Sequence, residues 1–411
     1  MPPVFGISIE RSVTDARPPV WDDLSVIGLV GTAPLATESA FPLNTPVLIR
    51  SSDRAALTAL GAQGTLADAV RLIDAQMGEF QSSALIVIVR VAPGVDTPGT
   101  IAALAGNEAA GTGVFALLDA APLLGHTPRL IAVPGFTSQL TPPATKNGVI
   151  AALESVLPRL LGHAVVSGPG TTEAAAQTWR ETLNSERLIP IEPGVMIMGA
   201  DGLPHQTDAA PAVLGIAVRR DFEFGGRPFH SWANQPVYGI VGLSRPIPFS
   251  LTDDATEGQV LLEANIGVIV RGELGVAGAI GDGGFVFIGT DNAGSDDLWR
   301  FYNVTRGRDY IHLAVLRSLR GYLGRFNLTG QTIQAVRNTL HGLLAQLKAD
   351  NDILGFTEDF VPAQNDADNL RQGRIVVTFQ AEEAPVLRHI TVESGRYRPA
   401  LDALIEDLAS V

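Results

Sequence analysis

The segment ALIVIVRVA (84–92) constrains the fold more than any other part of the chain. It is a nearly continuous apolar run of strand length, typical of a strand covered on both faces and too short for a membrane helix. Comparable runs recur at 24–34, 129–135, 163–170, 193–200 and 265–271. Helical spacing between runs, at 51–77, 144–161 and 172–187, predicts an α/β layered sandwich with a largely parallel sheet.

One internal segment interrupts this alternation. Residues 93–113 are small, polar and rich in glycine and proline, which predicts a surface crossover or linker. A domain boundary or an insertion could lie there.

The last third of the chain has a different pattern. Long helices are expected within 296–326 and 330–350, followed by a strand at 373–380. The second helix carries one apolar stripe, formed by Ile333, Val336, Leu340, Leu343, Leu344 and Leu347. The overall class is therefore α/β (α+β overall), with a helix-plus-sheet domain behind the sandwich.

The sequence predicts a strand, detached from the core, at each end of the chain. The alternating residues near the start are Val4, Phe5, Ile7 and Ile9, and Pro18 and Pro19 separate them from the core. The alternating residues near the end are Leu387, Ile390 and Val392, which follow Pro385 and precede a short amphipathic helix. A lone strand cannot satisfy its own backbone, so each must pair with this protein's own sheet or with another chain.

Composition excludes several classes of function. A length of 411 residues predicts two to three domains, and the absence of cysteine excludes disulfides and thiolate chemistry. A net charge of −14 argues against nucleic-acid binding, and the N-terminus lacks the pattern of a secretory signal. No direct membrane insertion is expected.

The sequence shows no clear catalytic or cofactor motif. The glycine clusters at 167–170 and 275–284 lack the spacing of phosphate-binding loops, the histidines are scattered, and 291–297 departs from a calcium loop. We therefore expect no catalytic residue, cofactor or metal. The competing hypothesis is an α/β enzyme or small-molecule-binding protein that forms a closed oligomer.

Positive charge is concentrated near the predicted long helices. Five arginines fall within 20 residues: Arg306, Arg308, Arg317, Arg320 and Arg325. They could form a docking face for an acidic partner, or they could pair with local carboxylates such as Asp309.

The C-terminal third resembles the contractile phage tail sheath family, particularly the short sheaths of contractile phages and R-type bacteriocins. The resemblance rests on GFVFIGTDNAGSDDLWRFYNVTRGRDYI (284–311) and on DADNLRQGRIVVTFQAEEAPVLRHI (366–390). The matching positions are Gly284 to Gly289, Asp296, Asp297, Phe301, Asn303 and Arg306. PPVFGISIE, VIGLVGTAP and PRLIAVPGF are also similar to that family, whereas 201–280 match poorly.

The resemblance implies a structural subunit that polymerises helically around an inner tube and contracts to drive the tube through a target cell envelope. In that family, terminal arms complete the sheets of neighbouring subunits, for which Ile375, Val377 and Phe379 are the expected acceptor strand. The partners implied are further copies of the chain, an inner tail tube protein, and baseplate and tail terminator components. Candidate tube contacts are Arg317, Arg320, Arg325 and Lys348.

The same resemblance implies a location and a division of the chain. We expect a virion tail or tail-like particle assembled in the bacterial host cytoplasm; a phage tail, a bacteriocin and other contractile injection systems remain alternatives. The expected segments are an N-terminal exchange arm (1–20), the first part of the core (21–92), the linker (93–113), a middle α/β domain (114–280), a C-terminal domain (281–384) and a C-terminal exchange arm with the terminal helix (385–411).

Overall fold

The body of the molecule is built on one mixed sheet. The computed structural model describes residues 23–78, 81, 83–140, 145–199, 202–272 and 283–409. The sheet has nine strands in the order β2-β3-β1-β4-β5-β6-β11-β12-β9. Their bounds are β1 (Ile27–Thr32), β2 (Pro46–Arg50), β3 (Leu85–Val91), β4 (Leu130–Ala132), β5 (His163–Ser167), β6 (Leu188–Glu192), β9 (Gln235–Pro236), β11 (Gly267–Arg271) and β12 (Phe285–Ile288).

The centre of this sheet is parallel, as its apolar strands predict. Neighbouring strands from β3 through β1, β4, β5 and β6 to β11 run parallel. At the two edges, β2 pairs antiparallel with β3, and β12 pairs antiparallel with β11 and β9. A small antiparallel sheet holds β10 (Gly242–Leu243), β7 (Val195–Met198) and β8 (Pro204–Thr207), so the 193–200 strand lies outside the main sheet.

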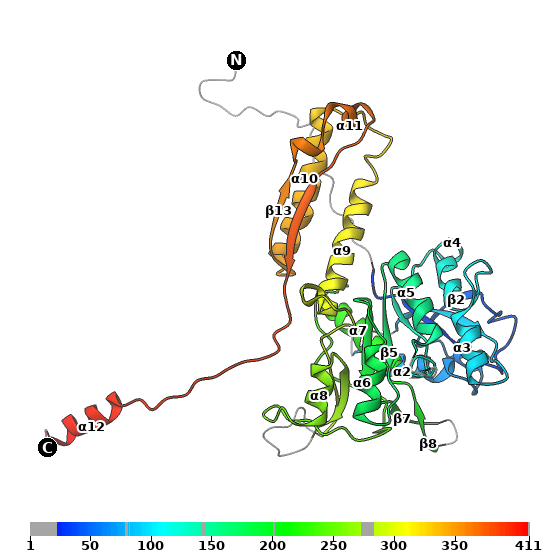
Figure 1. Cartoon of the computed structure of the whole chain (residues 1–411), viewed down its shortest axis with the longest axis horizontal. Helices are drawn as coiled ribbons and strands as arrows, with labels where there is room; N and C mark the ends of the chain where they lie inside the picture. The colour runs from blue at the N-terminus through cyan, green and yellow to red at the C-terminus, as the bar shows by residue number, and fades with distance from the viewer. Residues whose placement is uncertain are drawn as a thin grey trace.

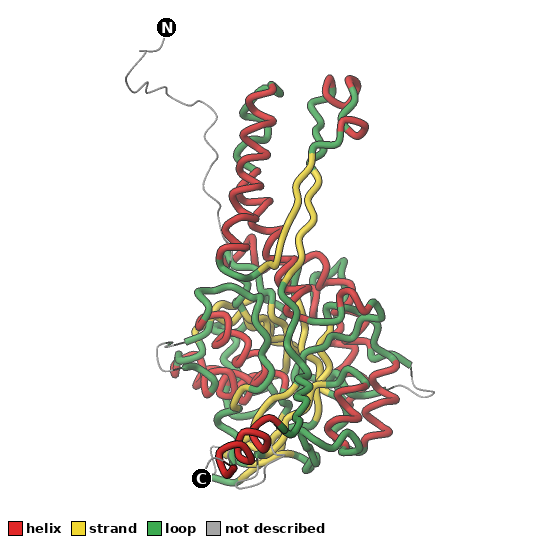
Figure 2. The backbone as a smooth tube through the Cα atoms, turned by 90° about the vertical axis from the view of Figure 1, so that its left-hand side faces the viewer, coloured by secondary structure: helices red, strands yellow, loops and turns green. Residues whose placement is uncertain are grey.

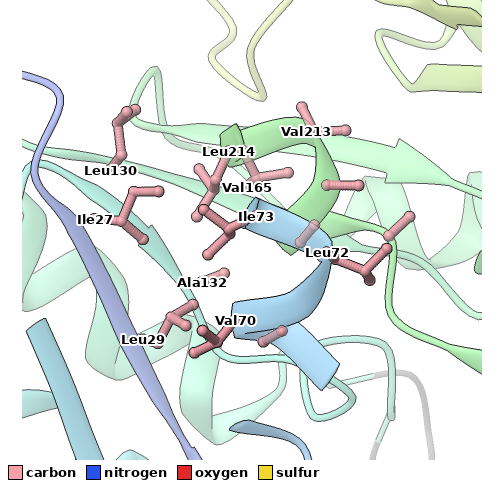
Figure 3. Packing of buried hydrophobic residues seen from close by; sticks show 14 of the residues in the cluster. Ile27, Leu29, Val70, Leu72, Ile73, Leu130, Ala132, Val165, Val213 and Leu214 are labelled. Atoms are coloured by element: carbon pink, nitrogen blue, oxygen red, sulfur yellow. The ribbon is translucent and has the colours of Figure 1, made fainter. Parts of the chain in front are cut away.

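Helices cover both faces of the main sheet and create two cores. Ile27 and Leu29 pack with α2 (Leu66–Ala75) and α7 (Ala210–Glu223), as Figure 3 shows. Val30 points to the opposite face, where η1 (Gly113–Asp119), α3 (Thr97–Ala105) and α5 (Gly148–Leu160) lie. Shorter helices complete the body: α1 (Arg54–Leu60), α4 (Ala120–Leu124), α6 (Glu173–Glu181) and α8 (Glu257–Glu263).

Two predictions of secondary structure need correction. The 51–77 segment forms two helices because Gly64 turns the chain between them with a φ of +92°. A Cβ at Gly64 would lie 2.2 Å from the Thr32 carbonyl oxygen, so only glycine fits there. Within 93–113, the expected surface linker instead contains helix α3, which Asp96 caps by accepting from the Gly99 amide at 2.7 Å.

The C-terminal third forms a separate layer with its own core. It contains η2 (Asp297–Trp299), α9 (Tyr302–Leu319), α10 (Gly330–Ala349), β13 (Ile353–Asp359), η3 (Pro362–Gln364), α11 (Ala367–Arg371) and β14 (Thr378–Glu383). Figures 1 and 2 show this layer projecting from the body, with β13 and β14 beside α10. The predicted stripe of α10 is confirmed as a core contact: Val336, Leu340, Leu343, Leu344 and Leu347 are buried, and Ile333 is half-buried.

The strand predicted at 373–380 begins later than expected. Asn365 accepts from the Val376 amide at 2.8 Å and donates to the Val376 carbonyl at 2.8 Å, so these backbone groups are unavailable to a sheet. Strand β14 therefore runs from Thr378 to Glu383, three residues past the predicted end at 380.

The end of the chain is an exposed arm. The predicted strand at 387–397 is absent from this chain, because no neighbouring strand of the described residues lies beside it to complete a ladder. The arm leads to the predicted amphipathic helix, α12 (Pro399–Ala409), which Figure 1 shows far from the body. The N-terminal arm residues Val4, Phe5, Ile7 and Ile9 lie outside the described residues.

Candidate assembly surfaces

A groove lies between the β13/β14 sheet and the start of α9. Its volume is about 540 Å³, and its apolar lining includes Leu298, Trp299, Phe356 and Phe379. The wall is fixed by Arg308, whose Nε donates to Glu383 Oε1 at 2.6 Å and whose guanidinium lies 5.0 Å from the Trp299 ring. Such a groove beside a two-stranded sheet can accept an extended apolar segment.

The predicted acceptor residues are divided by the late start of β14. Phe379 belongs to β14 and lines the groove, whereas Ile375 and Val377 precede the strand. Glu358 and Thr357 of β13 face Phe379 and Gln380 in antiparallel register. Phe356 also lines the groove, and the sequence analysis missed it because a register cannot be read from one strand alone.

The C-terminal arm presents apolar side chains that are exposed to solvent. Leu387, Ile390 and Val392 are exposed, as is every described residue from Leu387 to Ala409. The stripe of α12 is also exposed, since more than half of each side chain of Leu401, Leu404, Ile405 and Leu408 is accessible. An isolated helix of this length is marginal in water, so this face calls for a covering partner.

The five arginines of the predicted docking face separate into two groups. Arg306 is buried, and its Nη1 and Nη2 donate to the two carboxylate oxygens of Asp221 at 3.1 and 2.6 Å. Arg308 is committed to Glu383. Neither belongs to an external docking face, which corrects that interpretation for both residues.

The remaining arginines lie together near the far end of the layer. Arg317 is in the last turn of α9, and Arg320 and Arg325 lie in the connection to α10; all three are exposed. Exposed Leu316, Leu323 and Phe326 accompany them. Lys348 is exposed but lies near the opposite end of α10, about 27 Å along the helix from Gly330. The structure therefore does not bring Lys348 together with the three arginines.

Buried polar contacts join the C-terminal layer to the body. Besides the Arg306–Asp221 pair, Arg187 Nη2 donates to Asp309 Oδ1 at 3.0 Å. His163 Nε2 lies 3.1 Å from Thr305 Oγ1, and burial, reinforced by Arg187 and Arg306, lowers the pKa of His163 well below its usual value. Sequence reasoning missed these pairs because their members are far apart in the chain.

The crevice beyond strands β4 and β5 is where an α/β enzyme would bind a ligand. It has a volume of about 330 Å³, and its lining includes Gly135, Ser167 and Asp208. The Asp208 carboxylate accepts from Ser167 Oγ at 2.5 Å, Gly135 N at 2.6 Å and Ala210 N at 2.7 Å. Burial raises the pKa of Asp208, and these contacts use its oxygens within the chain.

Two kinds of feature are absent from the described part of the chain. No group of histidine and carboxylate side chains there is arranged to hold a metal ion. No helix among those residues combines the length and apolarity needed to cross a bilayer.

Sequence comparison identifies relatives among known proteins, although no family model matches the sequence. A prophage major tail sheath protein of Pseudomonas aeruginosa (strain UCBPP-PA14) is 29% identical over 92% of this chain and 93% of its own length. The tail sheath protein of Escherichia phage P2 is 26% identical over 90% of this chain and 89% of its own length.

Solved structures share the fold. A chain of the anti-feeding prophage helical sheath in its contracted state matches with a TM-score of 0.66 and 18% identity, covering 97% of this chain and 100% of the other. A chain of the anti-feeding prophage baseplate matches with a TM-score of 0.65 and 17% identity, covering 97% and 100%. The predicted mixed α/β fold and the resemblance to tail sheath proteins are therefore confirmed along nearly the whole chain.

Proposed function

We infer that this chain belongs to the contractile tail sheath family and is a structural subunit of such a sheath. The observation that carries this conclusion is the alignment with tail sheath proteins over about nine-tenths of the chain, on a shared fold. The alternative of an α/β enzyme or closed-oligomer binding protein has no support in these relatives. The chain works without a catalytic site or a cofactor in this proposal.

Assembly proceeds by exchange of strands between copies. The arm from Leu387 to Val392 and the N-terminal residues Val4 to Ile9 pair with the β13/β14 sheet of neighbouring subunits, and Phe356 and Phe379 receive their apolar side chains. Donor and acceptor surfaces differ, so the contact is heterologous and generates an open helix. The expected division of the chain, with boundaries at 281 and 385, follows these assembly units.

The exposed arginines form the contact with an acidic inner tube. Arg317, Arg320 and Arg325 are exposed along the last turn of α9 and its connection to α10. Exposed ion pairs are individually weak, which suits a surface that must release the tube during contraction. Lys348 lies too far from this group to share one tube contact with it.

Contraction requires no nucleotide in this mechanism. The extended sleeve is a kinetically trapped state, and the contracted sleeve buries more surface between bodies. An additional few hundred Å² of apolar area per subunit would supply several kcal/mol at about 25 cal/mol per Å², before entropic costs. Repeated along the sleeve, this drives the tube through a target envelope.

The remaining partners follow from the same role. A chain of similar fold occurs in the anti-feeding prophage baseplate, which supports attachment of this sleeve to baseplate components. A tail terminator would close the opposite end. We place the protein in a virion tail or tail-like particle that is assembled in the bacterial host cytoplasm.

Electron microscopy of the purified chain tests the proposal. We expect hollow tubes from the full chain, and discrete particles from a variant that lacks residues 1–19, with both variants folded by circular dichroism. Uniform closed rings from both variants, with or without an added tube protein, would contradict the proposal and favour a closed oligomer.

A further inference from the structure

The C-terminal arm is attached to its own body beyond the end of β14. The Ala384 amide donates to the Asp352 carbonyl at 3.2 Å, and Asn303 Nδ2 donates to the Ala384 carbonyl at 3.2 Å. Pro385 and Val386 line a small cavity of about 140 Å³ with Phe229. These contacts hold the first residues of the arm against the base of the C-terminal layer.

Arg388 makes the last of these attachments. Its Nη1 donates to both carboxylate oxygens of Asp291, at 3.1 and 3.0 Å, and its guanidinium lies 5.8 Å from the Phe301 ring. Asp291 and Phe301 are joined by an isolated β-bridge, so they form one rigid platform. After Arg388 every described residue of the arm is exposed.

The platform is stable without the arm. Asp291 is buried, and its Oδ2 also accepts from Arg300 Nε at 3.0 Å and Nη2 at 2.9 Å, while Thr290 Oγ1 donates to Oδ1 at 2.8 Å. Removal of Arg388 therefore leaves the carboxylate paired with Arg300. A buried charge without any partner would destabilise the fold, but the Asp291 carboxylate keeps its ion pair with Arg300.

We propose that Arg388 is a positioning residue that clamps the root of the C-terminal arm to Asp291 and Phe301. The free arm then begins at His389 rather than at Leu387. The ten residues 389–398 can span at most about 33 to 36 Å before α12 begins, which limits the neighbouring subunits that the arm can reach. The inference rests on the proposed function, because the clamp directs the arm toward one acceptor sheet.

The clamp is tested first in unassembled protein, where sleeve formation plays no part. The chain contains no cysteine, so Leu387→Cys and Thr178→Cys introduce unique sites for two spin labels, both at exposed positions. Below the concentration of assembly, we expect one narrow distribution of distances between the labels. Arg388→Ala should broaden it, Arg388→Lys should broaden it less, and Arg300→Ala, which removes the other cation from Asp291, should leave it narrow. A distribution that is equally wide with and without Arg388 would overturn the clamp.

Assembly then tests the positioning role. Arg388→Ala should raise the protein concentration needed for sleeves by about two- to five-fold, since the loosened arm is less concentrated at its acceptor. Arg54→Ala, at an exposed position of the body outside the clamp, should leave that concentration unchanged, and the melting temperatures show whether each body is intact. An unchanged threshold in Arg388→Ala would overturn the positioning role. If the parent chain forms no sleeves, the proposed function fails and the positioning role fails with it, while the label distances still decide whether the clamp exists.

Discussion

At the scale of single residues, the buried Arg306–Asp221 pair decides how the C-terminal layer is held. Arg306 lies in α9, Asp221 lies in α7 of the body, and both side chains are almost fully buried. The guanidinium also lies 5.0 Å from the Trp232 ring. The layer must transmit force to the body when subunits move, so a fixed joint serves the proposed contraction.

We expect Arg306→Ala to lower the free energy of unfolding by about 3–5 kcal/mol, because Asp221 would remain buried without its cation. Denaturation by urea measures the change. Arg371→Ala is the matched control: Arg371 pairs with Asp368, but the side chains are 80% and 83% exposed, so the loss should be below about 1 kcal/mol. Equal effects of the two substitutions would contradict the structural role of Arg306.

At the scale of elements, the sequence predicts those helices and strands that local residue patterns determine. Strands such as β3 are apolar throughout, and α10 carries its core residues at helical spacing, so both were predictable. Helix α3 was not, because its small residues bury little apolar surface and its start depends on the Asp96 cap. The start of β14 depends on Asn365, a contact across 11 residues that no periodicity encodes.

The candidate surfaces also divide into those that a local sequence pattern reveals and those that only the fold assembles. The arms and the exposed arginines are local patterns, and sequence reasoning selected them. The groove and the Arg388 clamp join segments that are distant along the chain, and Asp291 and Arg388 are 97 residues apart, so only the fold brings them together. For Arg306 and Arg308 the sequence left a docking face and pairing with carboxylates as alternatives; both are paired, but their partners Asp221 and Glu383 come from other elements and not from nearby residues such as Asp309.

The terminal helix α12 provides a prediction at this scale. Its stripe is apolar, whereas its other face carries Asp402, Glu406 and Asp407. Leu404→Asp together with Ile405→Asp should prevent or strongly reduce sleeve formation, since the stripe could no longer be buried against a neighbouring copy. The melting temperature of the unassembled chain should not change, because the helix does not contact the body.

Electron microscopy and light scattering provide the measurement. Glu406→Gln with Asp407→Asn alters the polar face of the same helix and should retain assembly. Normal sleeves from the Leu404 and Ile405 double variant would show that the apolar stripe has no partner in the sleeve.

At the scale of the whole molecule, charge is distributed unevenly. The chain carries a net charge of −14, yet Arg317, Arg320 and Arg325 gather at one end of the C-terminal layer. Copies therefore repel one another through most of their surface, while this end attracts an acidic tube. Salt screens both interactions, so the two assembly reactions should respond to it in opposite directions.

Raising the salt concentration from about 0.05 M to about 0.5 M should favour sleeves formed without a tube and weaken the attachment of subunits to an acidic tube.

Arg317→Glu with Arg320→Glu should abolish the tube attachment at low salt and leave the fold intact. Each reversal changes the charge by −2, so this variant carries −18 instead of −14. Arg50→Glu with Arg54→Glu has the same net charge, and both parent side chains are exposed on the body, in β2 and α1. If net repulsion alone governed tube binding, the two variants would fail equally; a loss confined to the Arg317 and Arg320 variant assigns the contact to this end. Cosedimentation with the tube measures both, and normal binding by the Arg317 and Arg320 variant would exclude this surface.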